Sequence, residues 1–384
     1  MNLQRISAIV VKEWREIVRD RLFFALAFVV PATLTLLFGF GLSLDVENVP
    51  LAVVDYDRSA LSREYAHRFS DSRYFDFKGQ LSDLREADAL LMRGQVRAVV
   101  VIPEHFEQRL LSGRPAEVQT LVDGTFPFRS LTSKGYITAI NASFSAGVLA
   151  TAIAQTRGVS VEDAAAALQP VPVEVRYLYN QSVKSVWSIA PKLLMAIMMI
   201  SPPFLTALGI VREKESGSIF NIYSSTVTRG EFLVGKLAPY VGISFLNVLI
   251  LWVLACFVFG APFKGNALFF ALTALLYVIC TTGIGLLVSV AVRTQVAAML
   301  GTAILTIVPA VLYSGILIPI SSLSSVATVI AHLLPGMYFA NITVGSFLKD
   351  VDLGELWPDV LALALYATVL FAAGYRLFHK RTAT

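Results

Sequence analysis

The chain has 384 residues, of which 56% are hydrophobic and only 15% are charged, and its mean hydropathy is +0.67. This composition excludes an ordinary soluble globular protein and indicates a polytopic membrane protein. The net charge of +4 comes mostly from Lys and Arg beside apolar stretches, where basic residues set the orientation of membrane helices. The basic balance therefore calls for no nucleic-acid partner, and we expect none.

Six long apolar stretches predict six transmembrane helices, because about 20 apolar residues are needed to cross a bilayer. The first covers residues 22–44 and is too long, and too far from the start, for a cleaved signal peptide. The other five lie near residues 187–211, 237–260, 267–292, 296–320 and 356–378. Basic residues gather before the first stretch, between the second and third, between the fourth and fifth, and after the sixth. By the positive-inside rule, both termini are expected in the cytoplasm.

Residues 45–184 would then lie outside the membrane as a soluble insert that is long enough to form its own domain. Short β-branched runs that begin at Leu51, Val96 and Val118 predict strands, and a further strand is expected at 173–179. Leucines and charges at helical spacing predict helices between these runs. The helices are expected at 59–69 and at 82–93, the second with Ser82 as its N-cap. This alternation of strands and helices predicts a small α/β domain.

Residues 132–157 are apolar enough to suggest a seventh membrane span. Lys134, Asn141 and Gln155, together with many small residues, favour an extracytoplasmic helix instead, followed by a second short helix. A span here would also invert the orientation of everything that follows. The predicted fold is therefore a polytopic α-helical membrane protein with six transmembrane helices and an inserted α/β extracytoplasmic domain.

Residues 321–350, between the fifth and sixth stretches, contain His332, Pro335 and Gly336 among moderately apolar neighbours. They are compatible with an amphipathic interfacial helix. They are equally compatible with a re-entrant pair of half-helices, because helix-breaking residues are tolerated at membrane depth when they are buried in protein. The sequence leaves both alternatives open.

The search for catalytic motifs finds one false lead, GEFLVGK at residues 230–236. It resembles a phosphate-binding P-loop, but Leu237 stands where Ser or Thr must hold magnesium, and no strand precedes it. The four histidines are scattered without a second ligand at suitable spacing, so no metal site is expected. We predict no catalytic residue, no bound cofactor and no metal.

Ionisable residues are confined to the ends of the predicted spans, where Lys192 and Asp359 lie about one turn inside. A proton- or sodium-coupled carrier usually needs such groups within the membrane. The transport energy, if the protein is a transporter, must therefore come from elsewhere.

The loop between the second and third stretches has the pattern of a docking element. Glu213, Lys214 and Glu215 alternate in charge, Gly217 permits a turn, and Ile219, Ile222 and Tyr223 recur at helical spacing. The alternative is a helix that only lies on the lipid head groups. That alternative does not explain acidic residues beside an anionic leaflet, so docking is favoured.

The same loop carries a family resemblance. REKESGSIFNIY at 212–223, followed by TRGEFLVGKLAPY at 228–240, resembles the signature of ABC-2 type exporter permeases. The segments at 98–113 and 118–125 resemble the exported domain of the drug-efflux branch, and residues 15–21 resemble its N-terminal interfacial helix. The chain departs from many members at Ile219 and Phe220, where they carry an acidic residue, and around Ser225 and Thr226, where proline is common. These departures leave the choice of ATPase open.

The resemblance covers essentially the whole chain and implies a domain order. It comprises a cytoplasmic interfacial helix at 1–21, a first span at 22–44, an extracytoplasmic domain at 45–184, and spans two to six at 185–384 with a coupling loop at 212–236. The residues expected to couple the loop to an ATPase are Arg212, Glu213, Lys214, Glu215, Gly217, Ser218, Ile219, Asn221, Ile222, Tyr223, Arg229 and Glu231.

The implied function is that of the permease subunit of an ATP-driven exporter in the bacterial inner membrane. It would move a drug-like or amphipathic substrate outward and would not be an enzyme, because a separate cytoplasmic ABC ATPase subunit binds the ATP. Further expected partners are a second permease copy or a paralogue, a periplasmic adaptor protein and membrane lipid. The alternative is a membrane-anchored scaffold or sensor with a ligand-binding periplasmic domain, for which one or two spans would suffice. The sequence leaves open the substrate and the choice between homodimer and heterodimer.

Overall fold

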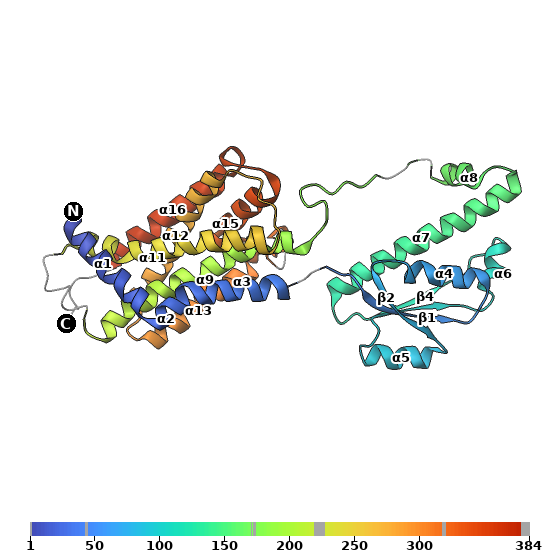
Figure 1. The fold of residues 1–384 in the computed structure, drawn as a ribbon, viewed down its shortest axis with the longest axis horizontal. Coiled ribbons are helices and arrows are strands. Elements are labelled where there is room, and N and C mark those ends of the chain that lie inside the picture. The colour runs from blue at the N-terminus through green and yellow to red at the C-terminus, as the bar shows by residue number, and fades with distance from the viewer. Residues whose placement is uncertain are drawn as a thin grey trace. The chain divides into compact units, whose positions relative to one another are not determined.

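Two compact units make up the chain in the computed structural model (Figure 1). The helical unit comprises Met1–Leu44 and Arg176–Thr384, and the α/β unit comprises Asp45–Val175. The structure describes residues 2–42, 45–169, 171, 174–218, 227–316 and 320–377.

Seven helices among the described residues are long and apolar enough to cross a membrane, and six of them belong to the helical unit. The first, Arg21–Gly41, combines α2 (Arg21–Phe24), a π-helical turn (Ala25–Val29) and α3 (Val30–Gly41). The others are α9 (Ser185–Glu215), α11 (Arg229–Val253) with a π-helical turn to Val258, α12 (Ala267–Ala291), α13 (Gln295–Leu312) and α16 (Leu353–Leu377). Each of the six predicted stretches overlaps one of these helices, so the protein is a polytopic helical membrane protein.

Helix α9 is the central helix of this unit, because most of its length is buried against α3, α11, α12, α13 and α15. Small residues let its neighbours come close. A Cβ added at Gly285 of α12 would lie only 2.5 Å from the carbonyl oxygen of Pro203 in α9. Helix α9 is therefore in contact with most of the other long helices of the unit.

Between α13 and α16, α14 (Ser325–His332) meets α15 (Pro335–Val344) and its π-helical extension to Lys349 at an angle of 84°. Most of α15 is buried and contacts α9, α12 and α16, which a helix lying on the membrane surface would not do. The backbone carbonyl of His332 at the bend accepts hydrogen bonds from the hydroxyls of Tyr338 and Tyr366, at 3.0 Å each. Of the two alternatives for this segment, the bend and the burial favour a pair of half-helices.

The α/β unit is built on a four-stranded sheet of order β2-β1-β3-β4. Its strands are β1 (Val49–Asp55), β2 (Phe75–Leu81), β3 (Ala98–Ile102) and β4 (Gln119–Val122), and only β4 runs antiparallel to its neighbour. The helices α4 (Ala60–Ser70) and α6 (Phe106–Leu111) cover one face, and α5 (Leu84–Met92) covers the other. The central strands β1 and β3 are buried on both faces, which explains their continuous β-branched runs.

Three sequence expectations for this unit need correction. Strand β2 was missed, because its Lys78-Gly79-Gln80 run is polar and an edge strand needs only one buried face. The strand expected at 173–179 is wrong for residues 174–179, which form none, and Val173 lies outside the described residues. The N-cap of α5 is Asp83, not Ser82, since its side chain accepts the backbone N–H of Glu86 at 2.9 Å.

Helix α7 (Pro127–Arg157) is the seventh candidate span by length and composition, but it belongs to the α/β unit. Ile137 and Phe144 of α7 are buried in the same apolar cluster as strands β1 and β3, and the Phe144 ring lies 4.8 Å from that of Tyr65 in α4. The helix ends at Gly158, whose φ of +66° suits glycine, and α8 (Val161–Leu168) packs back on it. The predicted long helix and the short helix that follows it are confirmed.

Candidate functional site

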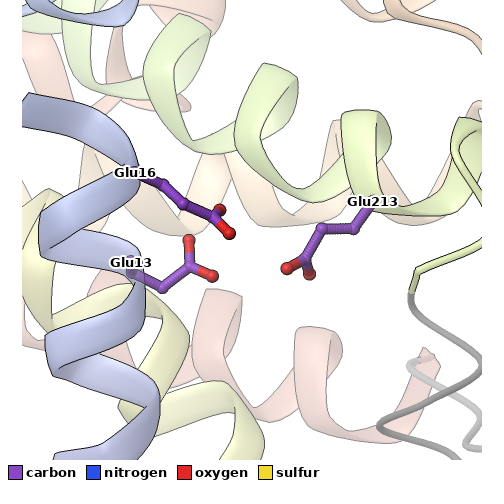
Figure 2. Close-up of side chains that lie close together, drawn as sticks. All are labelled: Glu13, Glu16 and Glu213. Carbon is purple, nitrogen blue, oxygen red and sulfur yellow. The ribbon is translucent and has the colours of Figure 1, made fainter. Parts of the chain in front are cut away.

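One end of the helical unit gathers charged residues from α1 (Leu3–Arg19), α9 and α11. Figure 2 shows the carboxylates of Glu13 and Glu16 on α1 and of Glu213 on α9 pointing toward one another. The ammonium group of Lys236 on α11 lies 2.7 Å from a Glu13 oxygen and 2.9 Å from a Glu213 oxygen, and this lysine is only 1% exposed. Lys12 pairs with the other carboxylate oxygen of Glu213. We call Lys12, Glu13, Glu16, Glu213 and Lys236 the ion cluster.

Ion pairs and hydrogen bonds of the ion cluster connect α1, α9 and α11. Burial raises the pKa of Glu13, and together with repulsion from Glu213 it outweighs the opposing effect of Lys236. Burial opposes the charge of Lys12, yet its hydrogen bond to Glu213 and the surrounding carboxylates outweigh burial and raise its pKa. The hydroxyl of Tyr240 on α11 donates to Glu13 at 3.1 Å. A shift of α9 would therefore pull on both α1 and α11.

The carboxylates of Glu13, Glu16 and Glu213 are close enough to one another to hold a metal ion. The ammonium groups of Lys12 and Lys236 already contact these carboxylate oxygens. A cation in the same place would have to displace them, so the chemistry of the cluster is that of ion pairing between helices.

Sequence reasoning missed the ion cluster. Glu13, Glu213 and Lys236 are far apart in the chain, and no local pattern signals their contact. The sequence indicates Lys236 only as a basic residue between the second and third stretches and as the lysine of the P-loop resemblance. Residues 230–236 in fact lie inside α11, and the Thr228 and Glu231 side chains form a capping box at the start of that helix. The segment is thus a helix start and offers no loop to hold phosphate.

Three further residues of the predicted coupling loop also make contacts within the chain. Arg212 pairs with Asp20, which precedes the first span, and its hydrogen bond lowers the pKa of that carboxyl group. Lys214 donates to the backbone carbonyl of Ser289 on α12. One oxygen of Glu215 accepts from both the backbone and the side-chain N–H of Gln295, at 3.0 Å each, at the start of α13.

The remaining loop residues divide into two groups. Gly217 follows the end of α9 with a φ of +76°, Ser218 is next to it, Arg229 is exposed, and Glu231 is buried and also accepts the backbone N–H of Asn2 at 2.7 Å. Ile219, Asn221, Ile222 and Tyr223 lie outside the described residues. The structure therefore brings together the charged ends of the loop, and its predicted apolar face stays a prediction.

A second polar site lies elsewhere in the helical unit, in a cavity of about 490 Å³. The ammonium group of Lys192 donates to the carbonyl of Gly315 at 2.8 Å, and Asp359 accepts from the side chain of Asn341 at 3.0 Å. Both residues line this cavity, together with Lys349 and Glu355. The ionisable residues near the ends of two spans are thus brought to one place.

The fold agrees with the comparison to known families. The profile of the ABC-2 family transporter proteins matches residues 21–376, so the chain belongs to this family. It is the permease subunit of an ABC-2 type exporter, and the ATPase activity resides in a partner subunit. The family predicted from the loop signature is confirmed, and the scaffold or sensor alternative loses its support.

Three relatives align with this chain over most of their own length. The chain is 30% identical over 351 residues to the Escherichia coli K12 protein named "Probable multidrug ABC transporter permease YbhS", covering 91% of this chain and 89% of the relative. It is 23% identical to that organism's "Probable multidrug ABC transporter permease YbhR", covering 98% and 99%. It is 25% identical to "Inner membrane transport permease YhhJ", covering 100% and 99%. The chain is accordingly a multi-pass inner membrane protein.

Proposed function

We propose that this permease exports an amphipathic or drug-like compound and is driven by a cytoplasmic ABC ATPase that docks on residues 212–236. The observation that carries the proposal is the charged last turn of α9. There, Glu213 contacts α1 and α11, Lys214 contacts α12, and Glu215 contacts the start of α13. Force applied to the loop would reach four helices at once. The two relatives named as multidrug permeases support a substrate of this class.

The proposed topology has six spans with both termini in the cytoplasm. The α/β unit, including α7, then forms the exported domain. The burial of Ile137 and Phe144 of α7 in the sheet cluster supports this assignment, because a helix that covers a sheet does not face lipid. The proposed domain order is an interfacial helix at 1–21, a first span at 22–44, an exported domain at 45–184 and five spans at 185–384.

Helix α1 has the features of an interfacial helix in this topology. Its buried side carries Glu13 and Ile17 toward the bundle, whereas Leu3, Trp14 and Val18 are exposed. Exposed apolar residues on one face, beside basic residues, are typical of a helix that lies in the head-group region.

We propose further that the permease works as a dimer, with a second copy or a paralogue, and that a periplasmic adaptor contacts the exported domain. YbhS and YbhR, two different relatives in one organism, support the paralogue alternative. Many apolar side chains of α13, including Val296, Leu300 and Ile304, are exposed in the single chain and are available to lipid or to a second permease.

The docking proposal is tested with a loop substitution that leaves the ion cluster intact. Glu213→Lys would place a third cation beside Lys12 and Lys236 and would disturb the fold, so it cannot isolate docking. Ile222→Glu instead disrupts the predicted apolar face. We expect this variant to insert normally, to lose co-purification with the ATPase and to lose export.

Gln295→Ala is the matched control, because it removes the side-chain hydrogen bond to Glu215, keeps the backbone one and leaves the predicted apolar face unchanged. It should retain the ATPase. If Ile222→Glu co-purifies with the ATPase in wild-type amounts and exports normally, the loop is only an interfacial helix and the docking proposal fails.

A further inference from the structure

A groove runs along one face of α7 in the α/β unit. It consists of a cavity of about 930 Å³ and a cavity of about 440 Å³. The two share the lining residues Ala116, Val118, Asn141 and Ser145, so they are continuous. Every lining residue belongs to the α/β unit. Each volume lies in the range of about 300–1,000 Å³ that is usual for small-molecule sites.

One wall of the groove is a stripe of α7 residues that its own domain leaves uncovered. The stripe recurs every three or four residues and comprises Leu131, Lys134, Thr138, Asn141, Ser145 and Leu149, all of them exposed. At 1.5 Å per residue it is about 27 Å long. The facing wall consists of edge strand β4, the segment that precedes it and α6.

The lining changes character along this length. The smaller cavity is apolar and lies between α6 and α7, with Phe106, Leu110, Phe144, Val148 and Leu149 in its walls. The larger cavity is lined by many polar side chains, including Thr120, Ser130, Lys134 and Thr138. Where the two meet, the buried Tyr65 donates its hydroxyl hydrogen to the side-chain oxygen of Asn141 at 3.3 Å. A ligand that fills both cavities must therefore be apolar at one end and polar at the other.

Charge indicates which polar group suits the groove. Lys134 and Glu117 line the larger cavity, and Arg114 lines the smaller one, so the groove as a whole has two cations and one anion. The ion pairs among the described residues of the α/β unit are Arg68–Glu64, Lys78–Asp76 and Arg97–Asp123. None of the three groove residues takes part in them. Lys134 is thus a cation that is available to a head group in the larger cavity.

We propose that this groove binds a single-chain amphiphile with an anionic head group. The tail lies in the apolar cavity between α6 and α7, and the head lies in the larger cavity near Lys134. This assignment rests on the proposed export of amphipathic compounds and names the chemical class that the exported domain meets.

The test uses the full chain, purified alone in lipid nanodiscs, and a dodecanoic acid probe that carries a diazirine at its tail end. After irradiation, peptide mass spectrometry locates the cross-links. We expect them in residues 106–111 and 144–152, with at least a tenfold decrease in Leu149→Asp. Leu149 is half exposed, so this variant should keep its fold, which thermal unfolding checks. The proposed site would be wrong if the cross-links were spread over the helical unit, or if Leu149→Asp were labelled as strongly as the wild type.

The head group is tested with Lys134→Glu and with the matched dodecylamine probe. Lys134→Glu should weaken labelling by the carboxylate probe at least fivefold and should not weaken labelling by the amine probe. Lys78→Glu, which changes a surface cation of β2 outside the groove, should leave both unchanged. If the wild-type groove takes up both probes equally, the anionic assignment is wrong.

Binding and export are measured separately, so the two proposals can fail separately. If Ile222→Glu loses export but the probe still labels the groove, the proposed binding site is supported. If the groove is not labelled but the protein still exports, the binding-site proposal is wrong and the export proposal is unaffected.

Discussion

At the scale of single residues, Lys236 is the residue on which the charged helix end depends most. Its ammonium group is buried between Glu13 and Glu213, and each of these carboxylates comes from a different helix. A buried ion pair contributes little net stability compared with an apolar replacement of the whole pair. Removing one partner is different, because it leaves the other charge buried and uncompensated.

We therefore expect Lys236→Met to destabilise the chain by about 3–5 kcal/mol. Glu13→Gln in the same chain should recover part of the loss, since it removes one of the uncompensated carboxylates. Denaturant unfolding of the purified protein measures both effects. Lys78→Met, which breaks an exposed pair with Asp76, is the control and should change stability by less than about 1 kcal/mol. Equal losses in Lys236→Met and Lys78→Met would contradict a buried ion cluster.

Asp57 is a second residue whose charge stabilises local structure. Its two carboxylate oxygens accept the backbone N–H groups of Phe106 and Glu107 at the start of α6, at 3.0 Å each. Burial opposes the ionised form, but hydrogen bonds from Ser59 and from these amides outweigh burial, so the pKa of Asp57 is lowered.

Because the folded-state pKa of Asp57 is lowered, its stabilising effect is present above the ordinary value of about 3.9 and is lost as the pH falls below it. Asp57→Ala should lower the stability of α6 at pH 7 by roughly 0.5–2 kcal/mol, as for loss of a helix cap. The difference from wild type should shrink as the pH falls below about 4. Hydrogen exchange of the Phe106 and Glu107 amides measures it. Asp88→Ala on the exposed side of α5 is the control, and a pH-independent difference for Asp57→Ala would refute the argument.

At the scale of elements, the contact between α9 and α11 depends on a glycine. A Cβ added at Gly209 of α9 would lie 1.8 Å from the hydroxyl oxygen of Tyr240 on α11. That hydroxyl donates to Glu13, so its position is fixed by the ion cluster. The close approach of α9 to α11 and the contact of α11 with α1 therefore both depend on the position of Tyr240.

Gly209→Ala should destabilise the chain by about 1–3 kcal/mol, because the added methyl group must push Tyr240 away. Gly242→Ala on α11 is the matched control. A Cβ there meets nothing within 4 Å, so the change should be neutral or slightly stabilising through helix propensity. Thermal unfolding of both variants makes the comparison. A Gly209→Ala protein as stable as Gly242→Ala would mean that the helices are further apart than described.

At the scale of the whole molecule, the proposed topology makes a direct labelling prediction. In a chain without Cys256 and Cys280, single cysteines at Ser112 and Ala142 should react with a membrane-impermeant reagent from the periplasm. Cysteines at Ser218 and Thr384 should react only from the cytoplasm. Ala142 is the informative position, because it lies near the middle of α7 and is exposed in the α/β unit. If Ala142→Cys is protected from both sides, α7 is a span and the six-span topology is wrong.

The sequence by itself determined the membrane class, the approximate positions of the long helices and the family. These follow from local patterns, since the bilayer demands about 20 consecutive apolar residues and a loop signature is continuous in the chain. The one predicted helix cap, Ser82, lies one residue before the observed cap, Asp83. Strand β2 was missed although Phe75, Phe77 and Leu81 alternate with polar residues, because Gly79 and the polar Lys78 and Gln80 weaken the apolar signal.

Only the tertiary structure decided which charges meet and what α7 packs against. The chain separation of Glu13 and Lys236 leaves no local trace of their contact, and Glu213 looked like a surface charge until α1 and α11 enclosed it. Likewise, the apolar composition of α7 suits either lipid or protein, and the packing of Phe144 on Tyr65 makes it a cover for the sheet. Hydrophobicity is a property of each residue, but burial and ion pairing are properties of pairs, and the fold alone chooses the pairs.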